Sequence, residues 1–130
     1  MNVVVVGTSH RLAPVGVREK VALDLGAAAE LARRLADGGE AVCLSTCNRT
    51  ELYLAGEDPD ILETVAVGAL VAIADGDIVS SLYRLRDAAA ALHLFRVAAG
   101  LDSLVPGEGE ILGQVRAAFD NGATGTVLGR

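Results

Sequence analysis

Cys47, Asn48 and Arg49 follow one another in LSTCNRTELY, residues 44–53, where an apolar run gives way to polar residues. A cysteine acts as a nucleophile through its thiolate, which a nearby guanidinium and free backbone N–H groups favour. Cys47 is therefore a candidate for attack on a carbonyl carbon. A lone cysteine is, however, more often a small hydrophobic residue. Residue chemistry alone leaves both interpretations open.

The other thiol and the two histidines are the next candidates. Cys43 lies within the apolar run and is expected to be buried. An extended strand would hold it ~13 Å from Cys47, too far for a disulfide. His93 is either a partly exposed helix residue or an acid or base that serves the cysteine. His10 follows an apolar run, and a loop residue that hydrogen-bonds the backbone explains it equally well.

The stretch GLDSLVPGEGEILGQV is rich in glycine and acidic residues. Its G-x-G-x-x-x-G pattern at 107–113 differs from the dinucleotide fingerprint, and no strand precedes it, so a nucleotide loop is rejected. The alternative is a Pro-Gly turn before a helix with acidic residues in its first turn. Glu110 and Gln114 lie one turn apart and suit recognition of an ammonium or amide group.

Apolar periodicity predicts the elements that position these residues. Strands are expected at 2–8, 40–46, 50–55 and 76–86. Helices are expected near 15–23, 26–39, 58–74, 88–100 and 108–119. The order β-α-β-β-α-β followed by helices predicts an α+β fold of the ferredoxin-like, split βαβ class with additional C-terminal helices.

Helix caps and helix faces can be predicted from the same pattern. Asp58, with Pro59 at the first helical position, opens the third helix, and Asp87 is expected to cap the fourth. The core side of the helix at 88–100 is expected to carry Leu92, Phe95 and Ala99. The core side of the helix at 108–119 is expected to carry Ile111, Val115, Ala118 and Phe119.

Bulk composition limits the function classes. The 130 residues are typical of one domain, and the apolar fraction of 52% suffices for one core. No run approaches the ~20 apolar residues that span a bilayer, and no signal peptide is recognised. Two cysteines make no disulfide framework, which fits a cytoplasmic protein. A net charge of −6 argues against a dominant phosphate-binding surface, although ten of the eleven cationic residues are Arg, which suits a local anion site.

Three segments resemble the N-terminal catalytic domain of glutamyl-tRNA reductases. They are VVGTSHRLAPVGVRE at 5–19, LSTCNRTELY at 44–53 and HLFRVAAGLDSLVPGEGEILGQV at 93–115. The resemblance implies that a cysteine thiolate attacks the ester of glutamyl-tRNA and that NADPH reduces the resulting thioester to glutamate-1-semialdehyde, the first step of tetrapyrrole (porphyrin) synthesis. It identifies Cys47 as the nucleophile and assigns His93 a proton-handling or orienting role. The residues expected around the glutamyl group are Thr46, Asn48, Arg49, Ser103, Glu108, Gly109, Glu110 and Gln114, with Arg49 on the side-chain carboxylate.

The resemblance covers one domain of a longer enzyme. Residues 1–130 are expected to form this catalytic domain alone, so the NADPH-binding and dimerisation domains would lie outside the chain, and the fragment would stop at thioester formation or hydrolysis. The full-length protein is expected to be a homodimer with no membrane association, and glutamate-1-semialdehyde aminomutase is a candidate partner. Glu110 stands where many members of the family have Gln.

Two other functions remain open at this point. The predicted topology is shared with RNA-recognition modules, but those need aromatic residues on the sheet to stack bases, and this chain has two Phe and two Tyr. A cysteine esterase or acyl-transfer domain without a hydride step would differ only in the fate of the thioester.

Overall fold

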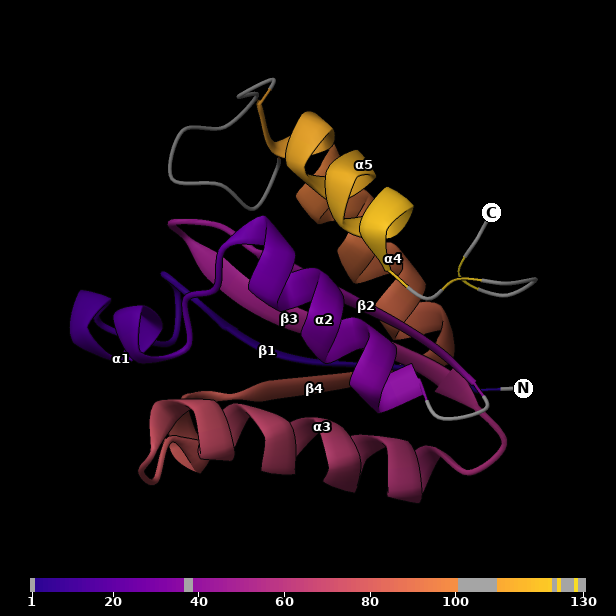
Figure 1. Ribbon diagram of the computed structural model, residues 1–130, viewed down its shortest axis with the longest axis horizontal. Helices are drawn as coiled ribbons and strands as arrows, with labels where there is room; N and C mark the ends of the chain where they lie inside the picture. Colours follow the sequence, from indigo (N-terminus) through magenta and orange to yellow (C-terminus); the bar gives the residue numbers. More distant parts are fainter. Residues whose placement is uncertain (1, 37–38, 101–109, 123, 125–127, 129–130) are drawn as a thin grey trace.

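The computed structural model describes residues 2–36, 39–100, 110–122, 124 and 128. They form a mixed α/β fold built on a four-stranded antiparallel sheet (Figure 1). In chain order the elements are β1 (Asn2–Ser9), α1 (Val15–Lys20), α2 (Leu25–Ala36), β2 (Glu40–Ser45), β3 (Arg49–Gly56), α3 (Pro59–Ala74), the 3-10 turn η1 (Val79–Ser81), β4 (Tyr83–Arg86), α4 (Asp87–Ala98) and α5 (Glu110–Asn121).

The strands lie side by side in the order β2-β3-β1-β4, and each neighbouring pair is antiparallel. The two central strands, β1 and β3, are the longest. Their register sets Gly7 opposite Glu51, and the β1–β4 register sets the same glycine opposite Tyr83. One cross-strand row therefore joins β3, β1 and β4.

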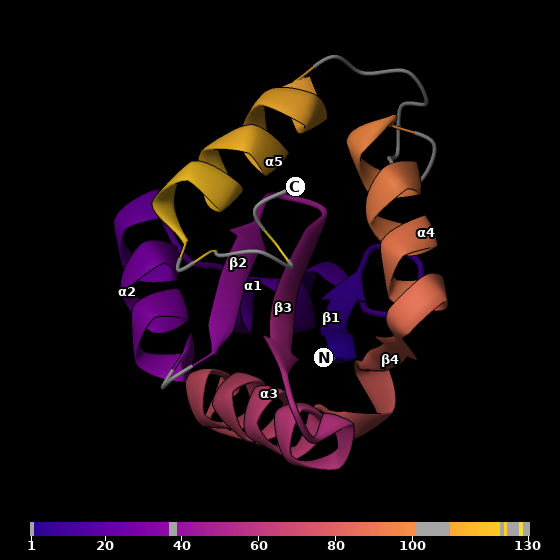
Figure 2. The same cartoon turned by 90° about the vertical axis from the view of Figure 1, so that its right-hand side faces the viewer.

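Helices cover both faces of the sheet, as Figure 2 shows. Alternate side chains of a strand point to opposite faces, so β1 and β3 contribute to two cores. One core packs against α2 and α3 and includes Val4, Val6, Cys43, Leu52, Leu54, Leu31 and Leu70. The other packs against α4 and α5 and includes Val5, Val42, Leu44, Tyr53, Val97, Ile111 and Val115. Because both faces are covered, the strands read as almost continuous apolar runs.

The predicted N-cap of α3 and the predicted buried face of α5 are confirmed. Asp58 is the N-cap of α3, and its carboxylate accepts from the backbone N–H groups of Asp60 and Ile61, as predicted. In α5 the predicted inward face is confirmed: Ile111, Val115 and Ala118 are buried, and the fourth predicted residue packs partly buried against the same core.

Two predictions around β4 were wrong. The strand comprises only the last four residues of 76–86, because η1 takes up the preceding segment. Asp87 does not cap α4, since Arg86 occupies the N-cap position and Asp87 is the first helical residue, with φ of 50°. The Asp87 carboxylate instead accepts a hydrogen bond from the Val3 N–H at 3.0 Å, so it ties the start of α4 to β1.

The predicted inward face of α4 was also wrong. Leu92 and Phe95 are 61% and 73% exposed, and Ala99 is exposed as well. The buried face carries Ala90 and Val97 instead. The helix carries apolar residues on all of its sides, so the apolar pattern alone did not define its buried face. The contact that orients the helix is polar and is described below.

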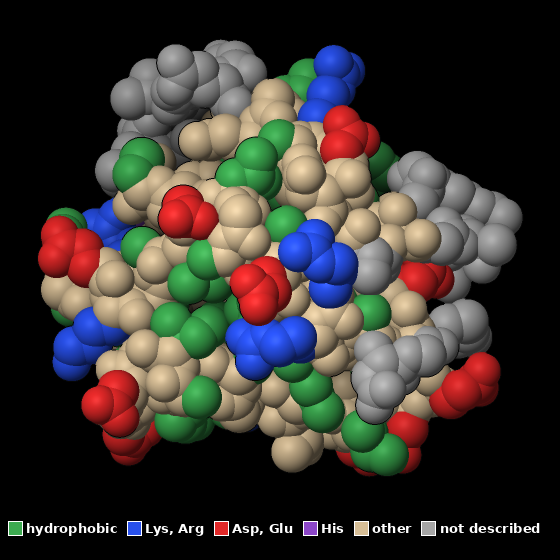
Figure 3. Space-filling model, viewed as in Figure 1, with side chains coloured by type: hydrophobic (Ala, Val, Ile, Leu, Met, Phe, Trp, Pro, Cys, Tyr) green, Lys and Arg blue, Asp and Glu red, His purple; other side chains and the backbone are tan. Residues whose placement is uncertain are grey.

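Figure 3 shows acidic and basic side chains interspersed on one broad face of the molecule, without a continuous basic surface. This distribution agrees with the net charge of −6. None of the helices in the described ranges is both long and apolar enough to cross a membrane.

Candidate active site

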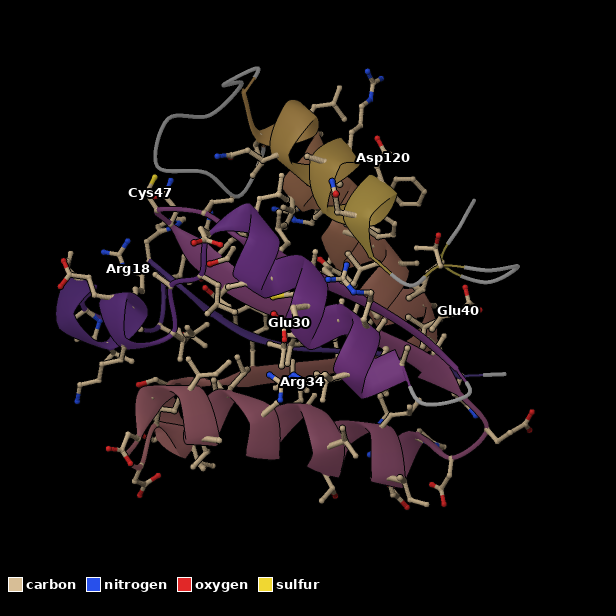
Figure 4. The ribbon with its side chains drawn as sticks, viewed as in Figure 1. Arg18, Glu30, Arg34, Glu40, Cys47 and Asp120 are labelled. Atoms are coloured by element: carbon tan, nitrogen blue, oxygen red, sulfur yellow. The ribbon has the colours of Figure 1, made fainter. Side chains whose placement is uncertain are left out.

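Cys47 lies at the tip of the β2–β3 hairpin and is exposed. The Thr46 N–H donates to the Arg49 carbonyl at 2.7 Å, so Cys47 and Asn48 form a two-residue turn. Figure 4 shows Cys47 at one end of the sheet, far from Glu40 at the start of β2. The hairpin turn therefore exposes the Cys47 thiol to solvent at this end of the sheet.

Hydrogen bonds fix this turn from three directions. Thr46 Oγ1 accepts from the Asn48 N–H at 3.2 Å within the turn. The His10 N–H donates to the Asn48 carbonyl at 2.9 Å. Arg18, from α1, donates through Nη1 to the Cys47 carbonyl at 3.2 Å, and both side chains are labelled in Figure 4. Arg18 was not singled out from the sequence, where nothing distinguishes it from the other arginines of the chain.

Cys43 is the opposite kind of thiol. It is buried in the core beneath α2, and burial raises the pKa of its thiol from 9.0 to about 12. A neutral, buried thiol is inert as a nucleophile. Between the two cysteines, only Cys47 is accessible to a substrate.

We expect alkylation to separate the two thiols. Iodoacetamide should modify one cysteine in the native chain, Cys47, and the second only after denaturation, because Cys43 is both buried and protonated. Mass spectrometry with and without urea measures this. The Cys47→Ser variant should show no native modification, and rapid double modification of the native chain would contradict the assignment.

A buried polar cluster lies directly behind this turn. Arg49, Glu51 and Tyr53 alternate along β3, so they share the sheet face that α4 and α5 cover. All three are at most 1% exposed. Arg49 Nη1 is 3.4 Å from Glu51 Oε2, and the Tyr53 hydroxyl donates to Glu51 Oε1 at 2.8 Å.

Two further side chains reach Glu51 from other elements. The Tyr83 hydroxyl, from β4, and His93 Nε2, from α4, both hydrogen-bond Glu51 Oε2. The Tyr83 and His93 rings also contact one another, with centroids 5.2 Å apart. His93 thus turns toward the sheet while its side chain stays 14% exposed. Glu51 and Tyr83 were missed from the sequence.

The Glu51 carboxyl is held ionised despite its burial. Burial raises its pKa, but hydrogen bonds from His93 and Tyr83 and the positive charge of Arg49, joined by that of His93 whenever its ring is protonated, lower it by more, so that its pKa lies below the usual value. In turn, burial and the Glu51 charge raise the pKa of Tyr53, which remains a neutral donor.

Gly7 gives Glu51 the room to reach these partners. Two strand spacings, roughly 10 Å, separate β3 from β4, so the Glu51 side chain must cross over β1. A Cβ on Gly7 would lie 2.8 Å from Glu51 Cγ and 2.7 Å from the Thr50 carbonyl oxygen. The polar cluster therefore requires a glycine at this position of β1. A single glycine within a β-branched run is also the sequence signal from which the Glu51 cluster could have been predicted.

Replacing Gly7 by Ala is expected to destabilise the fold by about 1–3 kcal/mol, the usual cost of overpacking, because the backbone at Thr50 cannot give way as a flexible side chain would. Urea unfolding measures the effect. Gly68, within α3, is the matched control: a Cβ there meets nothing within 4 Å, so Gly68→Ala should stabilise the helix by about 0.5–1 kcal/mol. An unchanged Gly7→Ala midpoint would contradict the close packing.

The remaining predicted substrate residues are placed only in part. Gln114 is exposed on α5 and lines a cavity of about 190 Å³ together with Ser45, two residues before Cys47. Ser103, Glu108 and Gly109 lie outside the described residues. Glu110 begins α5.

Within the described part of the chain, no three His, Cys, Asp or Glu side chains are grouped so as to hold a metal ion. The described sheet does not fit a dinucleotide either, because all its neighbouring strands are antiparallel, whereas dinucleotide folds rely on parallel βαβ units. The site thus combines an exposed thiol, Cys47, with a carboxylate–imidazole pair, Glu51 and His93, that lies under α4.

Comparison with known proteins agrees with this chemistry. Residues 6–130 match the family described as glutamyl-tRNAGlu reductase, N-terminal domain. The glutamyl-tRNA reductases of Marinobacter nauticus and Myxococcus xanthus are 46% and 42% identical to it, over 100% and 99% of the chain and 32% and 30% of their own lengths. The solved structure of glutamyl-tRNA reductase from Methanopyrus kandleri matches 92% of the chain and 27% of its own, with a TM-score of 0.73 and 35% identity.

The chain thus spans about a third of the curated relatives that it matches. The family match covers nearly all of it, and the matched range includes both the Cys47 hairpin and the Glu51 cluster. This chain belongs to the glutamyl-tRNA reductase N-terminal domain family.

Proposed function

We propose that this chain is the domain of a glutamyl-tRNA reductase that takes the glutamyl group from its tRNA. The observation that carries the proposal is the exposed Cys47, held in a hairpin turn whose residues 46–49 are tied by hydrogen bonds, in a chain of this family. The alternative thiol, Cys43, is buried.

In the proposed reaction, the Cys47 sulfur attacks the ester carbonyl carbon of glutamyl-tRNA. An S–C bond forms, the ester C–O bond breaks, and the tRNA leaves with its terminal hydroxyl restored. His93 takes the thiol proton and returns it to the departing oxygen, a role that suits an imidazole near neutral pH. The product on the protein is a glutamyl thioester.

The proposed selectivity for glutamate rests on Arg49. Its planar guanidinium carries five N–H donors and matches a carboxylate in geometry, so contact with Glu51 is compatible with contact to a substrate carboxylate. Thr46 and Asn48 flank the thiol. We further propose that Ser103, Glu108, Gly109, Glu110 and Gln114 complete the glutamate pocket; the position of Gln114 beside the end of β2 supports this placement.

The proposed reductase activity needs a hydride from NADPH. Because the described sheet does not fit a dinucleotide, we propose that NADPH binds to a domain outside residues 1–130. We also propose that any dimerisation domain lies outside these residues. We propose a cytoplasmic protein, with glutamate-1-semialdehyde aminomutase as a candidate partner. In fold terms, we propose the ferredoxin-like, split βαβ class, supported by the strand order β2-β3-β1-β4 and by α3 between β3 and β4.

The experiment that tests the proposal compares two aminoacyl-tRNAs. The chain is incubated with tRNA charged with radiolabelled glutamate or glutamine and then quenched in acid, and label on the protein is counted. We expect label from glutamyl-tRNA and at least about tenfold less from glutaminyl-tRNA, because the amide cannot replace a carboxylate opposite Arg49. Equal labelling would contradict the Arg49 clamp, and absence of label from both would contradict the proposed function.

A further inference from the structure

Four described side chains donate hydrogen bonds to Glu51. The Tyr53 hydroxyl bonds Oε1, whereas Tyr83, His93 and the Arg49 guanidinium approach Oε2. An ionised carboxylate has no proton to donate. The two hydroxyls and the imidazole nitrogen must therefore supply the hydrogens themselves.

This arrangement determines the protonation of the His93 ring. Since Glu51 is an acceptor only, the hydrogen between it and His93 lies on Nε2. In a neutral imidazole, one nitrogen carries the proton and the other carries the lone pair. Nδ1 is then the atom that accepts a proton.

The surrounding contacts hold both partners in place. Glu51 is 0% exposed and is fixed by donors from β3 and β4. The His93 side chain is 14% exposed, and its ring packs at 55° against that of Tyr83, a tilted contact that favours one ring orientation. Gly7 keeps open the path over β1 that the Glu51 side chain takes.

We propose that Glu51 positions His93 as the Nε2–H tautomer, so that Nδ1 is the ring atom left to accept a proton; in the proposed reaction this is the atom that takes the proton of the Cys47 thiol. The inference rests on the proposed function for its consequence in the reaction, but its structural half stands on the geometry alone. The logic is that of a buried carboxylate in a Ser-His-Asp triad, which holds the imidazole in the productive tautomer without taking its proton.

The test reads the tautomer directly. The 15N-labelled chain is studied by long-range 1H–15N NMR over a series of alkaline pH values, and the tautomer is read where the ring signals show one protonated and one unprotonated nitrogen. The chain has two histidines, so a His10→Gln variant assigns both. We expect His93 to be protonated at Nε2. A ring protonated at Nδ1 would overturn the proposal without any reference to activity.

Two variants connect the tautomer to the reaction. Glu51→Gln should yield a mixture of His93 tautomers and lower the rate of label transfer from glutamyl-tRNA by about 10²- to 10⁴-fold, the usual contribution of a general base. Tyr83→Phe keeps the Glu51–His93 bond, so it should retain the Nε2–H tautomer and lose at most about tenfold in rate. A folded Glu51→Gln variant with an unchanged tautomer or an unchanged rate would overturn the proposal.

If Glu51→Gln fails to fold, the tautomer of the unmodified chain and of Tyr83→Phe still decides the matter, because the proposal requires Nε2–H in both. An unmodified chain that shows the Nε2–H tautomer but takes no label would contradict the proposed function and leave the structural assignment of His93 supported. The failures of the two proposals are thus distinguishable.

Discussion

Replacing Cys47 by Ser is expected to abolish transfer of the glutamyl group to the protein, with a loss of at least about 10³-fold in rate, the order seen when a covalent nucleophile is removed. A serine hydroxyl is similar in size to the thiol, and Cys47 is exposed, so the hairpin should be unaffected. It lacks the accessible ionised state that makes cysteine nucleophilic near neutral pH. Acid-quenched label on the protein measures the rate.

Cys43→Ser is the matched control for this experiment. It changes the other thiol of the same hairpin, in β2, and leaves the turn intact. We expect full label transfer per folded molecule, together with some loss of stability, because a hydroxyl replaces a buried apolar group. Label that persists in Cys47→Ser and disappears in Cys43→Ser would reverse the assignment of the two thiols.

Replacing Glu51 by Gln is expected to cost about 3–5 kcal/mol of unfolding free energy, because it removes the charge of one member of a buried ion pair, to which Tyr53, Tyr83 and His93 also hydrogen-bond. This is a large share of the 5–15 kcal/mol typical of a domain. The loss should appear as a lower midpoint of urea unfolding. As a control, Glu63→Gln also removes a carboxylate beside an arginine, Arg86, but at the surface, and should change the midpoint little.

The same pair predicts a dependence on pH. The folded-state pKa of Glu51 lies below its ordinary value of 4.5, so its ionisation stabilises the fold fully at higher pH. That contribution is lost as the pH falls below 4.5 through the folded-state value. The stability difference between the unmodified chain and Glu51→Gln should therefore shrink in acid. A constant difference from pH 7 down to pH 3 would contradict an ionised Glu51.

Much of the fold follows from local sequence patterns. The β-branched run at the start of the chain, the alternation in TELYLA and the Asp58-Pro59 helix start each carry a short-range physical cause, and the structure has a strand or helix at each of them. The exposed Cys47 also follows, because a two-residue turn has no interior in which to hide a side chain.

The features that could not be predicted depend on contacts distant in sequence. Leu92 and Phe95 looked like core residues because α4 is apolar on all sides, and only the contact between His93 and Glu51, 42 residues away, shows which face turns inward. Likewise, Glu51 in an alternating strand suggests a solvent-facing position. Helices on both faces of the sheet leave no solvent face, so the charge must be satisfied internally, by partners from β4 and α4.

The central claim is that Cys47 carries the glutamyl group, and locating that group on the chain tests it most directly. After reaction with glutamyl-tRNA and an acid quench, trypsin releases a peptide of residues 35–49 that contains both cysteines, and fragment ions between Cys43 and Cys47 separate the two sites. The account predicts a glutamyl adduct on Cys47 alone. An adduct on Cys43, on another residue, or on no residue of the chain would contradict it.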